Sequence, residues 1–566
     1  MAYFLKKTNH KGKCYLAIYE SFYDHNKKGT AHRSYQSLGS LQTLMESGIE
    51  DPVSFFQAEV DKLNSDRAAK GVKKISDRSP IMYLGYFPLS SIVESLKVKK
   101  EIDYFKLTHS FDYDLFELIT SLVYSRVINP CSKYRTFHEI IPYLYNSYDY
   151  SYDQLLDGLS FIGNEYHKFV EIFTVAVKKI YGIDTSATYF DCTNFYFEID
   201  REDDFRRKGP SKEGRKDPIA ALGLLLDRNL IPIGMEMFPG NESEKPVLRE
   251  VIDNLKQRNN ITGRTIHVAD KGLNCAENIA FSKKSGDGYL FSKSVKQLPK
   301  VEQEWILLDN DYIVVKDKNG IVLYRYKSCI DKFPYKVVHE GKEVTIYLTE
   351  KRVVTYNPSL AIKQRYEINK QVEKAKHLTL SNAKKNEFGD LSKYVNFTDG
   401  NGGKADVSIN QSAIDRDLLL AGYNLLITSE INMTELDIYT TYHLLWRIEE
   451  LFRIMKSELD ARPVFLQKEN AIVGHFTICY ISVQLERIFE FMILENRFSA
   501  SEIFKFIRGF HVIKEGSKYI NTSTTSPLFK YLTEDTGLPL ENYYLSETQV
   551  RSIFNYVFKD RRKLPE

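Results

Sequence analysis

The stretch YHLLWRIEELFRIMKSEL, from Tyr442 to Leu459, has a strong helical pattern and repeats polar residues at a spacing of seven. Tyr442, Glu449 and Lys456 are nearly two helical turns apart, so one continuous helix would carry all three on one face. The apolar residues of the stretch fall on a separate arc and predict a buried stripe. The pattern therefore predicts an anchored helix whose carboxylate faces outward, or an ordinary packed helix with a solvated polar face.

Two other segments each place an aspartate on or directly after an expected β-strand. In TSATYFDCTNFYFEID (185–200), β-branched and aromatic residues alternate with small polar ones around Asp191. In TIHVADKGL (265–273), a short apolar strand ends at Asp270. A strand-to-loop position of this kind is suited to exposing a side chain. Taken singly, such aspartates are more often turn or cap residues.

The chain thus has two aspartates on strands followed by a glutamate on a helix. This order resembles that of the catalytic residues in the DDE transposases of bacterial insertion sequences. The similarity is closest to the superfamily with a Tyr-x2-Arg-x3-Glu-x6-Lys signature and a long insertion before the glutamate. Tyr442, Glu449 and Lys456 keep that register, whereas Leu445 stands where the signature has arginine. Arg453 is one of two nearby arginines that can supply the missing charge; the other, Arg447, points well away on the helical wheel.

Further segments carry the same resemblance over most of the chain. FRRKGPSKEGRKDP (205–218) looks like the family's Gly-x-Ser-Lys-x-x-Arg element, and FPGNESE and ELDARPVFLQKENAIVGHF also match. In the first of these, Lys212 and Arg215 are expected to contact DNA phosphates. A charged loop that is merely solvated is the alternative.

The resemblance implies a site for two divalent cations, Mg²⁺ or Mn²⁺, held by Asp191, Asp270 and Glu449. Two such ions about 4 Å apart suit phosphodiester cleavage, and carboxylates are the ligands that Mg²⁺ prefers. We expect Asp191 to bridge both ions, with Asp270 and Glu449 each completing one. These three residues are thus the expected catalytic and metal-binding residues.

Several other residues are expected to bind DNA. Lys456 and Arg453 lie near Glu449 on the helical wheel and can bind a phosphate, although an ion-pair lattice along the helix is equally compatible. Tyr442 is expected there chiefly from the family signature. Trp446 and Trp305 are candidates for stacking on a flipped base, and plain core packing is the alternative for both.

The composition is compatible with a multidomain protein but does not identify its partner. The chain has 566 residues, 43% of them hydrophobic, and a formal net charge of +3. This charge is too small to indicate nucleic-acid binding, so any basic surface must be local. The six cysteines show no zinc spacing, and we find no signal peptide or membrane span. We therefore expect a cytoplasmic, nucleoid-associated protein without a membrane partner.

The pattern of elements, together with the resemblance, predicts an α/β fold with a ribonuclease-H-like mixed sheet. We expect a small β-plus-helix module at 1–75, with a hairpin at Lys11-Gly12-Lys13, and a helical DNA-end-binding region at 76–180. The catalytic core is expected at 181–300 and 418–500. Because the gap between the second aspartate and the glutamate is long, we expect a β-rich insertion at 301–417. Residues 501–566 are expected to be helical.

The function that this resemblance implies is metal-dependent DNA cleavage at transposon ends and strand transfer into target DNA. Its partners would be double-stranded DNA, both terminal inverted repeats and target, and a second copy of the chain in a homodimer. Two alternatives are a nuclease of the same fold without strand transfer and a catalytically inactive DNA-binding derivative.

Overall fold

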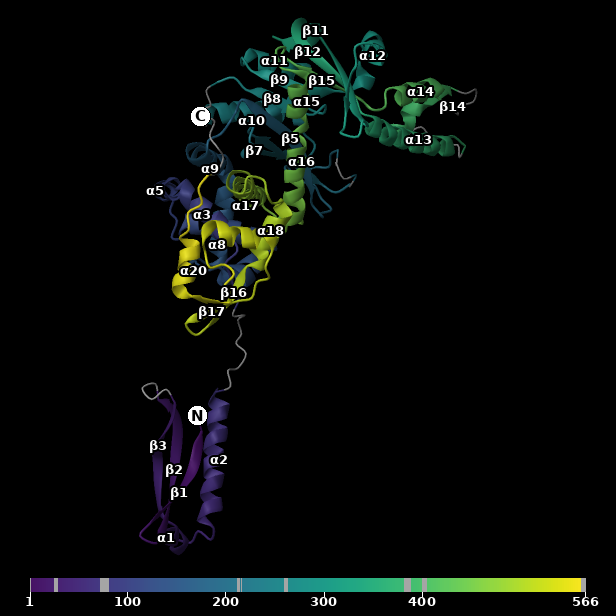
Figure 1. The fold of residues 1–566 in the computed structure, drawn as a ribbon. Helices are drawn as coiled ribbons and strands as arrows, with labels where there is room; N and C mark the ends of the chain where they lie inside the picture. The colour runs from purple at the N-terminus through teal and green to yellow at the C-terminus, as the bar shows by residue number, and fades with distance from the viewer. Residues whose placement is uncertain are drawn as a thin grey trace. The chain divides into compact units, whose positions relative to one another are not determined.

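The computed structural model describes residues 2–24, 29–71, 81–210, 214, 216–258, 263–380, 388–399 and 405–560. The chain divides into two compact units, Met1–Pro80 and Ile81–Glu566. Figure 1 shows the elements of both.

The first unit is an antiparallel three-stranded sheet with two helices. The predicted hairpin is confirmed, because His10 pairs with Lys13 across a two-residue turn. Both turn residues have positive φ, as a tight hairpin turn requires. The carboxylate of Glu20 on the second strand binds Arg33 of the third strand and Arg67 of the long helix. The elements are β1 (Tyr3–His10), β2 (Lys13–Asp24), β3 (Gly29–Ser40), α1 (Leu41–Glu46) and α2 (Pro52–Gly71).

The second unit begins with a mainly helical region, as the periodicity predicts. Helix α8 packs on a later helix, α17 (Glu469–Arg487), through two glycines. A Cβ atom at Gly163 would lie 1.7 Å from the carbonyl oxygen of Asn470, and one at Gly474 would lie 2.0 Å from that of Leu159. The elements are β4 (Ile81–Tyr83), α3 (Phe87–Leu96), α4 (Lys99–Asp103), α5 (Phe105–Thr108), α6 (Leu115–Ile128), α7 (Lys133–Arg135), α8 (Tyr152–Asn164) and α9 (Tyr166–Tyr181).

A nine-stranded mixed sheet forms the centre of this unit, in the order β10-β11-β12-β15-β9-β8-β5-β6-β7. The predicted meander of β5, β6 and β7 is antiparallel, and β5 and β8 are parallel neighbours, as expected. Strand β6 is apolar throughout and buried on both faces. The strands and crossover helices are β5 (Ala187–Tyr196), β6 (Ile219–Leu226), β7 (Pro232–Pro239), α10 (Glu244–Arg258), β8 (Ile266–Ala269), α11 (Ala276–Lys284), β9 (Gly288–Lys293) and β15 (Tyr423–Thr428).

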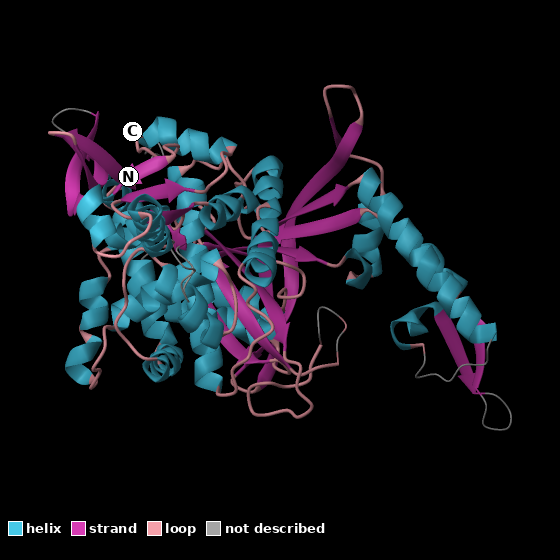
Figure 2. Ribbon diagram, turned by 90° about the horizontal axis from the view of Figure 1, so that it is seen from below, coloured by secondary structure: helices cyan, strands magenta, loops and turns pink. Residues whose placement is uncertain are grey.

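The insertion that we expect at 301–417 is joined to the central sheet. Its long strands extend the central sheet, because β12 pairs with β15, and a long helix then leads to a small two-stranded ladder (Figure 2). Backbone pairing thus makes the strands of the insertion part of the core sheet. The elements are α12 (Lys300–Leu307), β10 (Ile313–Lys316), β11 (Val322–His339), β12 (Lys342–Tyr356), α13 (Pro358–Leu380), β13 (Val395–Asp399), β14 (Ala405–Ile409) and α14 (Gln411–Leu419).

The stretch from Tyr442 to Leu459 is not one regular helix. Tyr442 lies in α15 (Glu435–His443), Glu449 lies in α16 (Trp446–Arg453), and Lys456 lies in a turn of π-helix (Ile454–Glu458). Between α15 and α16 the backbone tightens, since the amide of Leu445 donates to the carbonyl of Tyr442. The tight turn and the wide turn change the helical phase while keeping the apolar side chains buried, so a constant 3.6-residue period does not describe this segment.

Residues 501–566 are likewise not wholly helical. Two short strands form a hairpin whose first strand pairs with β4 at the start of this unit. Each strand has only four or five residues, which is too short for a clear alternating pattern. The elements are α18 (Ala500–Gly509), β16 (His511–Glu515), β17 (Lys518–Asn521), α19 (Pro527–Thr536), β18 (Tyr544–Ser546) and α20 (Glu547–Phe554).

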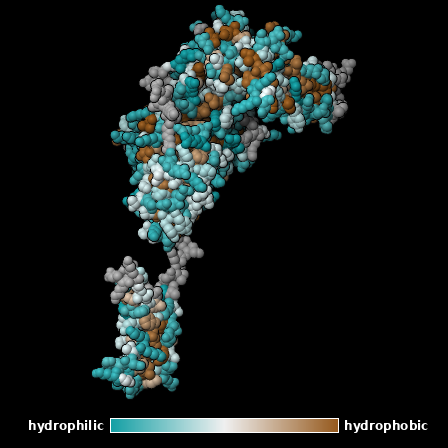
Figure 3. Space-filling view, viewed as in Figure 1, coloured by the Kyte–Doolittle hydropathy of each residue, from teal (hydrophilic) through white to brown (hydrophobic). Residues whose placement is uncertain are grey.

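Apolar side chains are also exposed on the outer strands of the sheet. Leu323 on β11 and Val344 on β12 are examples, and Figure 3 shows hydrophobic surface at the β11 and β12 end of the second unit. Within the described residues, no helix has both the length and the apolar character needed to cross a membrane.

Candidate active site

The two predicted aspartates are neighbours on adjacent parallel strands. Phe190 pairs with Ala269, so Asp191 and Asp270 are the next residues along β5 and after β8. Adjacent strands lie about 5 Å apart, and side chains in register leave a sheet on the same face. Both carboxylates are partly exposed. Sheet pairing therefore brings together two acids that are far apart in the sequence.

Hydroxyl groups hold the Asp270 carboxylate from two other elements. Ser292 Oγ on β9 donates to Asp270 Oδ1 at 3.0 Å, and the Tyr442 hydroxyl on α15 donates to the same oxygen at 3.3 Å. Burial raises the pKa of Tyr442 well above its ordinary value, and the negative charges of Asp270 and Asp191 add to this increase. Tyr442 is therefore a protonated hydrogen-bond donor that lies beside both aspartates.

Glu449 lies between two points at which its helical segment contacts the strands of the site. Tyr442, seven residues earlier, contacts Asp270, and Lys456 Nζ, seven residues later, lies 5.4 Å from the ring centroid of Phe195. Phe195 is on the same face of β5 as Asp191, because side chains alternate along a strand. Glu449 is exposed in the first turn of α16. Among the described residues, no group of three Asp, Glu, His or Cys side chains lies close enough to hold a metal ion.

A buried ion cluster fixes α16 against α17. Arg487 is almost wholly buried and contacts Glu490 and, at 3.2 Å, Glu450. Arg447 donates to the same Glu450 oxygen at 2.9 Å. Although burial opposes ionisation, these arginines hold the pKa of Glu450 below its ordinary value. Glu450 thus has a structural role, while the neighbouring Glu449 points to solvent.

The two arginines near the signature position have different environments. Arg447 is held in the buried ion cluster, so it does not supply the missing charge at the site. Arg453 is exposed and lies 3.7 Å from Glu450. Leu445, at the signature's arginine position, is only 8% exposed and belongs to the main hydrophobic core. A leucine suits this position because an arginine here would bury a charge.

The remaining predicted DNA-binding residues lie in different places. Trp446 is 48% exposed, one turn from Glu449, with the Arg447 guanidinium 4.1 Å from its ring centroid. Trp305 lies in α12 and packs against the core, with the amino group of Lys327 5.0 Å from its ring centroid. Lys212 and Arg215 lie outside the described residues.

A basic cavity that we did not predict from the sequence opens beside Asp270. It has a volume of about 590 Å³, and Asp270, Ser292 and Tyr442 form part of its wall. The wall continues from the sheet to helix α13 and includes Lys271, Lys293, Lys296, Lys363 and Lys393. Single lysines at scattered positions give no sequence motif, so only the fold reveals that they face one space.

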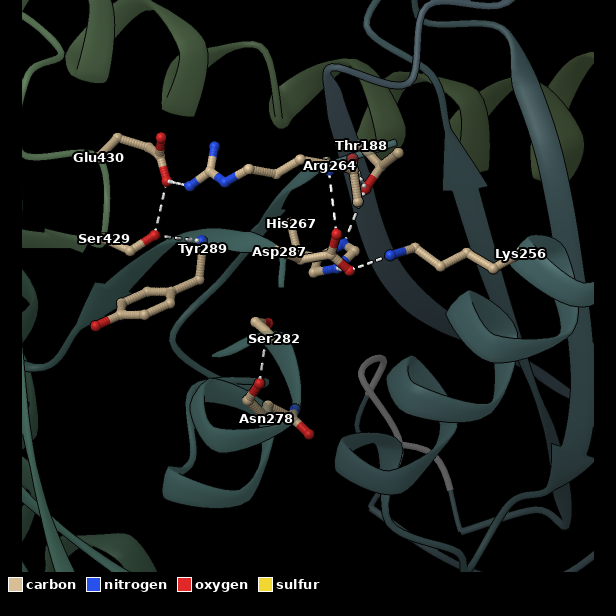
Figure 4. Close-up of polar contacts among 11 residues, drawn as sticks. Thr188, Lys256, Arg264, His267, Asn278, Ser282, Asp287, Tyr289, Ser429 and Glu430 are labelled. Atoms are coloured by element: carbon tan, nitrogen blue, oxygen red, sulfur yellow. Dashed lines mark hydrogen bonds and ion pairs between the residues drawn. The ribbon is translucent and has the colours of Figure 1, made fainter. Parts of the chain in front are cut away.

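A second polar cluster, at the other end of the same strands, is structural. Thr188 Oγ1 lies 3.1 Å from His267 Nδ1, and His267 Nε2 lies 3.0 Å from Asp287 Oδ2. This order of hydroxyl, imidazole and carboxylate resembles a catalytic relay (Figure 4). All three side chains are buried, however, and Asp287 also binds Lys256 of α10. The cluster therefore connects strands and helix and has no access to a substrate.

A family model and a solved structure are similar to the chain. A family model described as "Transposase DDE domain" matches residues 191–485, which begin at the first aspartate of the site and include the glutamate helix. The cryo-EM structure of the piggyBac transposase synaptic complex with hairpin DNA is similar over 86% of this chain and 87% of that chain, at 9% identity. Its TM-score of 0.36 is too low to support a shared fold. No curated protein matches the chain.

Proposed function

The chain belongs to the transposase DDE domain family, and we propose that it cuts DNA at the ends of a mobile element and joins the freed 3′ ends to target DNA. The observation that carries this proposal is the side-by-side position of Asp191 and Asp270 at the start of a stretch that matches the family model. The meander β5-β6-β7 followed by parallel β8 and β9 supports a ribonuclease-H-like assignment for the core.

The donor set suits a hard divalent cation, since all three candidate ligands are carboxylates. Asp191 and Asp270 would hold Mg²⁺ or Mn²⁺, with Glu449 on α16 as the third ligand. When bound, two such ions neutralise charge on the phosphate and activate the attacking oxygen. Tyr442 and Ser292 orient Asp270 through their hydrogen bonds to Oδ1.

The basic cavity provides a path for the DNA backbone beside the carboxylates. Its lysines come both from the core, as Lys293 of β9, and from the insertion, as Lys363 of α13, so both parts would contact one strand of DNA. We propose Lys271 and Lys363 as phosphate contacts, because both line the same cavity as Asp270. Lys456, in the π-helical turn after α16, and the exposed Trp446 in the first turn of α16 are proposed as further DNA contacts.

The test of this function uses a labelled DNA duplex that carries the element ends flanking the reading frame, with a target plasmid. Wild-type protein in Mg²⁺ or Mn²⁺ should cut the duplex and form strand-transfer products. Asp191→Asn, Asp270→Asn and Glu449→Gln should abolish both steps while end binding in calcium persists. The exposed control variants Asp415→Asn and Glu469→Gln should keep both activities.

Each other outcome points to a different protein. Cleavage without joined products would indicate a nuclease of the same fold, and end binding without cleavage by the wild type would indicate an inactive DNA-binding derivative. Cleavage retained in Asp270→Asn would overturn the assignment of the site.

The contribution of the cavity is tested by the salt dependence of DNA binding. Lys363→Ala should weaken binding to all DNA sequences and lower the slope of log affinity against log salt by about 1. Lys376→Ala is the matched control, because Lys376 lies on the same helix, outside the cavity, and pairs with Glu373 at 2.9 Å. Equal slopes for the two variants would exclude the cavity from the DNA path.

A further inference from the structure

Three buried basic side chains lie together beneath the surface at a distance from the carboxylates. Arg126 on α6, Lys133 at the start of α7 and His475 on α17 are 5%, 6% and 4% exposed, respectively. All three line one cavity of about 520 Å³. Among the described residues, no acidic side chain forms an ion pair with Arg126 or Lys133. Buried cations without a counter-charge are costly, so this arrangement needs an explanation.

The hydrogen bonds within the cluster leave donors available for a ligand. Lys133 Nζ lies 3.1 Å from His475 Nδ1, and His475 Nε2 lies 3.1 Å from the carbonyl oxygen of Ala461. The carbonyl can only accept, so Nε2 carries the proton and Nδ1 accepts from the lysine. An ammonium group has three donors, so Lys133 keeps two for another acceptor. Arg126 donates to the carbonyl oxygens of Cys131 and Leu459.

The charges of this cluster repel one another when nothing else is bound. Burial lowers the pKa of Lys133 well below its ordinary value, and the nearby Arg126 lowers it further. The pKa of His475 is lowered by burial and by the same two cations. Asp460 is the only acidic residue on the described cavity wall, and it is exposed. An anion in the cavity would satisfy the free donors and restore the charge of the lysine.

We propose that this cavity binds a phosphate group through Arg126 and Lys133, with His475 orienting the lysine. The mouth of the cavity also carries Arg135 and Tyr134, both exposed and suited to an extended ligand. The group can be free inorganic phosphate or a phosphate of the DNA backbone, and the second source depends on the proposed function. The wall of the cavity continues to Pro463, next to Arg462, whose guanidinium lies 4.7 Å from the ring centroid of Tyr196 on β5. Tyr196 follows Asp191 by five residues, or about 17 Å of strand.

The first experiment uses inorganic phosphate with the full-length protein. The thermal unfolding midpoint is measured in phosphate and in chloride at equal ionic strength and pH. We expect phosphate to raise the midpoint of the wild type and to have no such effect on Lys133→Met or Arg126→Gln. Lys168→Met is the matched control, because Lys168 is exposed and paired with Glu171; it should keep the full response.

Lys133→Met also separates ligand binding from a purely structural role. Burying a basic group without a counter-charge costs stability, so removing the Lys133 amine should raise the midpoint in chloride, whereas loss of a structural contact would lower it. A wild type with equal midpoints in both salts would overturn the proposal, as would a full phosphate response in Lys133→Met. If Lys133→Met does not fold, Arg126→Gln gives the same comparison.

The second experiment identifies the source of the phosphate group. Binding of a labelled DNA duplex is measured without divalent cations, with and without competing inorganic phosphate. If the site holds a backbone phosphate, phosphate competes and Lys133→Met binds DNA roughly tenfold more weakly or worse. If DNA affinity is unchanged while the phosphate response depends on Lys133, the ligand is free phosphate. Neither result depends on DNA cleavage, so failure of the proposed function is distinguishable from failure of this site.

Discussion

Exchange of Glu486 for glutamine is expected to remove a pH-dependent loss of stability. Glu486 lies on α17 with 0% exposure, and no described group donates a hydrogen bond to either carboxyl oxygen. Arg487 Nε is 3.8 Å away, but that guanidinium is bound to Glu490 and Glu450. Burial therefore raises the pKa of Glu486 in spite of the arginine, and the neighbouring carboxylates add to the increase.

The sign and size of the effect follow from proton linkage. Below the ordinary carboxyl pKa, the group is protonated in both the folded and the unfolded chain, so its full contribution to stability is present. As the pH rises toward the pKa of Glu486 in the folded chain, only the unfolded chain releases the proton. The free energy of unfolding therefore falls by about 1.4 kcal/mol per pH unit. Between pH 4.5 and 6.5 the wild type should therefore lose about 2 kcal/mol through this group. Glutamine has no proton to release and should lose none of it.

The assay compares unfolding midpoints of wild type and Glu486→Gln at several pH values in this range. The variant should gain stability relative to the wild type as the pH rises. Glu469→Gln is the control, because it makes the same exchange on an exposed residue of the same helix. A constant difference between Glu486→Gln and wild type across the range would refute the reasoning.

Three further predictions concern packing and the site. Arg487→Met should lower the free energy of unfolding by about 3–5 kcal/mol at pH 7, because it leaves buried carboxylates unpaired. The loss should be smaller at pH 5, where these carboxylates are more readily protonated. Equal losses at both pH values, measured by thermal unfolding, would contradict this. Gly474→Ala should destabilise the fold by about 1–3 kcal/mol or more, because the added Cβ meets the carbonyl of Leu159. Gly509→Ala is the control, since a Cβ there meets nothing within 4 Å. Equal unfolding midpoints for the two variants would contradict the prediction. Tyr442→Phe should slow DNA cleavage roughly tenfold without abolishing it, through loss of one hydrogen bond to a carboxylate; an unchanged rate over a titration of Mg²⁺ would exclude the positioning role.

Much of the central sheet could be predicted from the sequence because its signals are local. The alternation around Asp191 and the apolar run before Asp270 each define a strand, and the crossover helix between them makes the two strands parallel neighbours. The apolar positions of the glutamate helix likewise predict which face is buried. These patterns repeat within a few residues and depend little on distant contacts.

Other features depend on contacts between distant segments and leave no local pattern. The segment containing Tyr442 and Glu449 is divided into α15 and α16 by a tight turn in which Leu445 is buried. The strands of the insertion join the core sheet through backbone pairing with β15. The lysines of the basic cavity and the cluster around Lys133 come from separate elements. A scan along the chain finds such residues only one at a time, whereas folding brings them to one place.

The central claim is that Asp191, Asp270 and Glu449 bind the same cations. Iron-mediated cleavage of the polypeptide tests it directly. With hydrogen peroxide as oxidant and ascorbate to reduce Fe³⁺ again, Fe²⁺ bound in place of Mg²⁺ generates hydroxyl radicals that cut only the nearby backbone. Cuts are expected next to all three residues, each suppressed by excess Mg²⁺. Cuts near Asp191 and Asp270 with none near Glu449, with DNA present or absent, would contradict it.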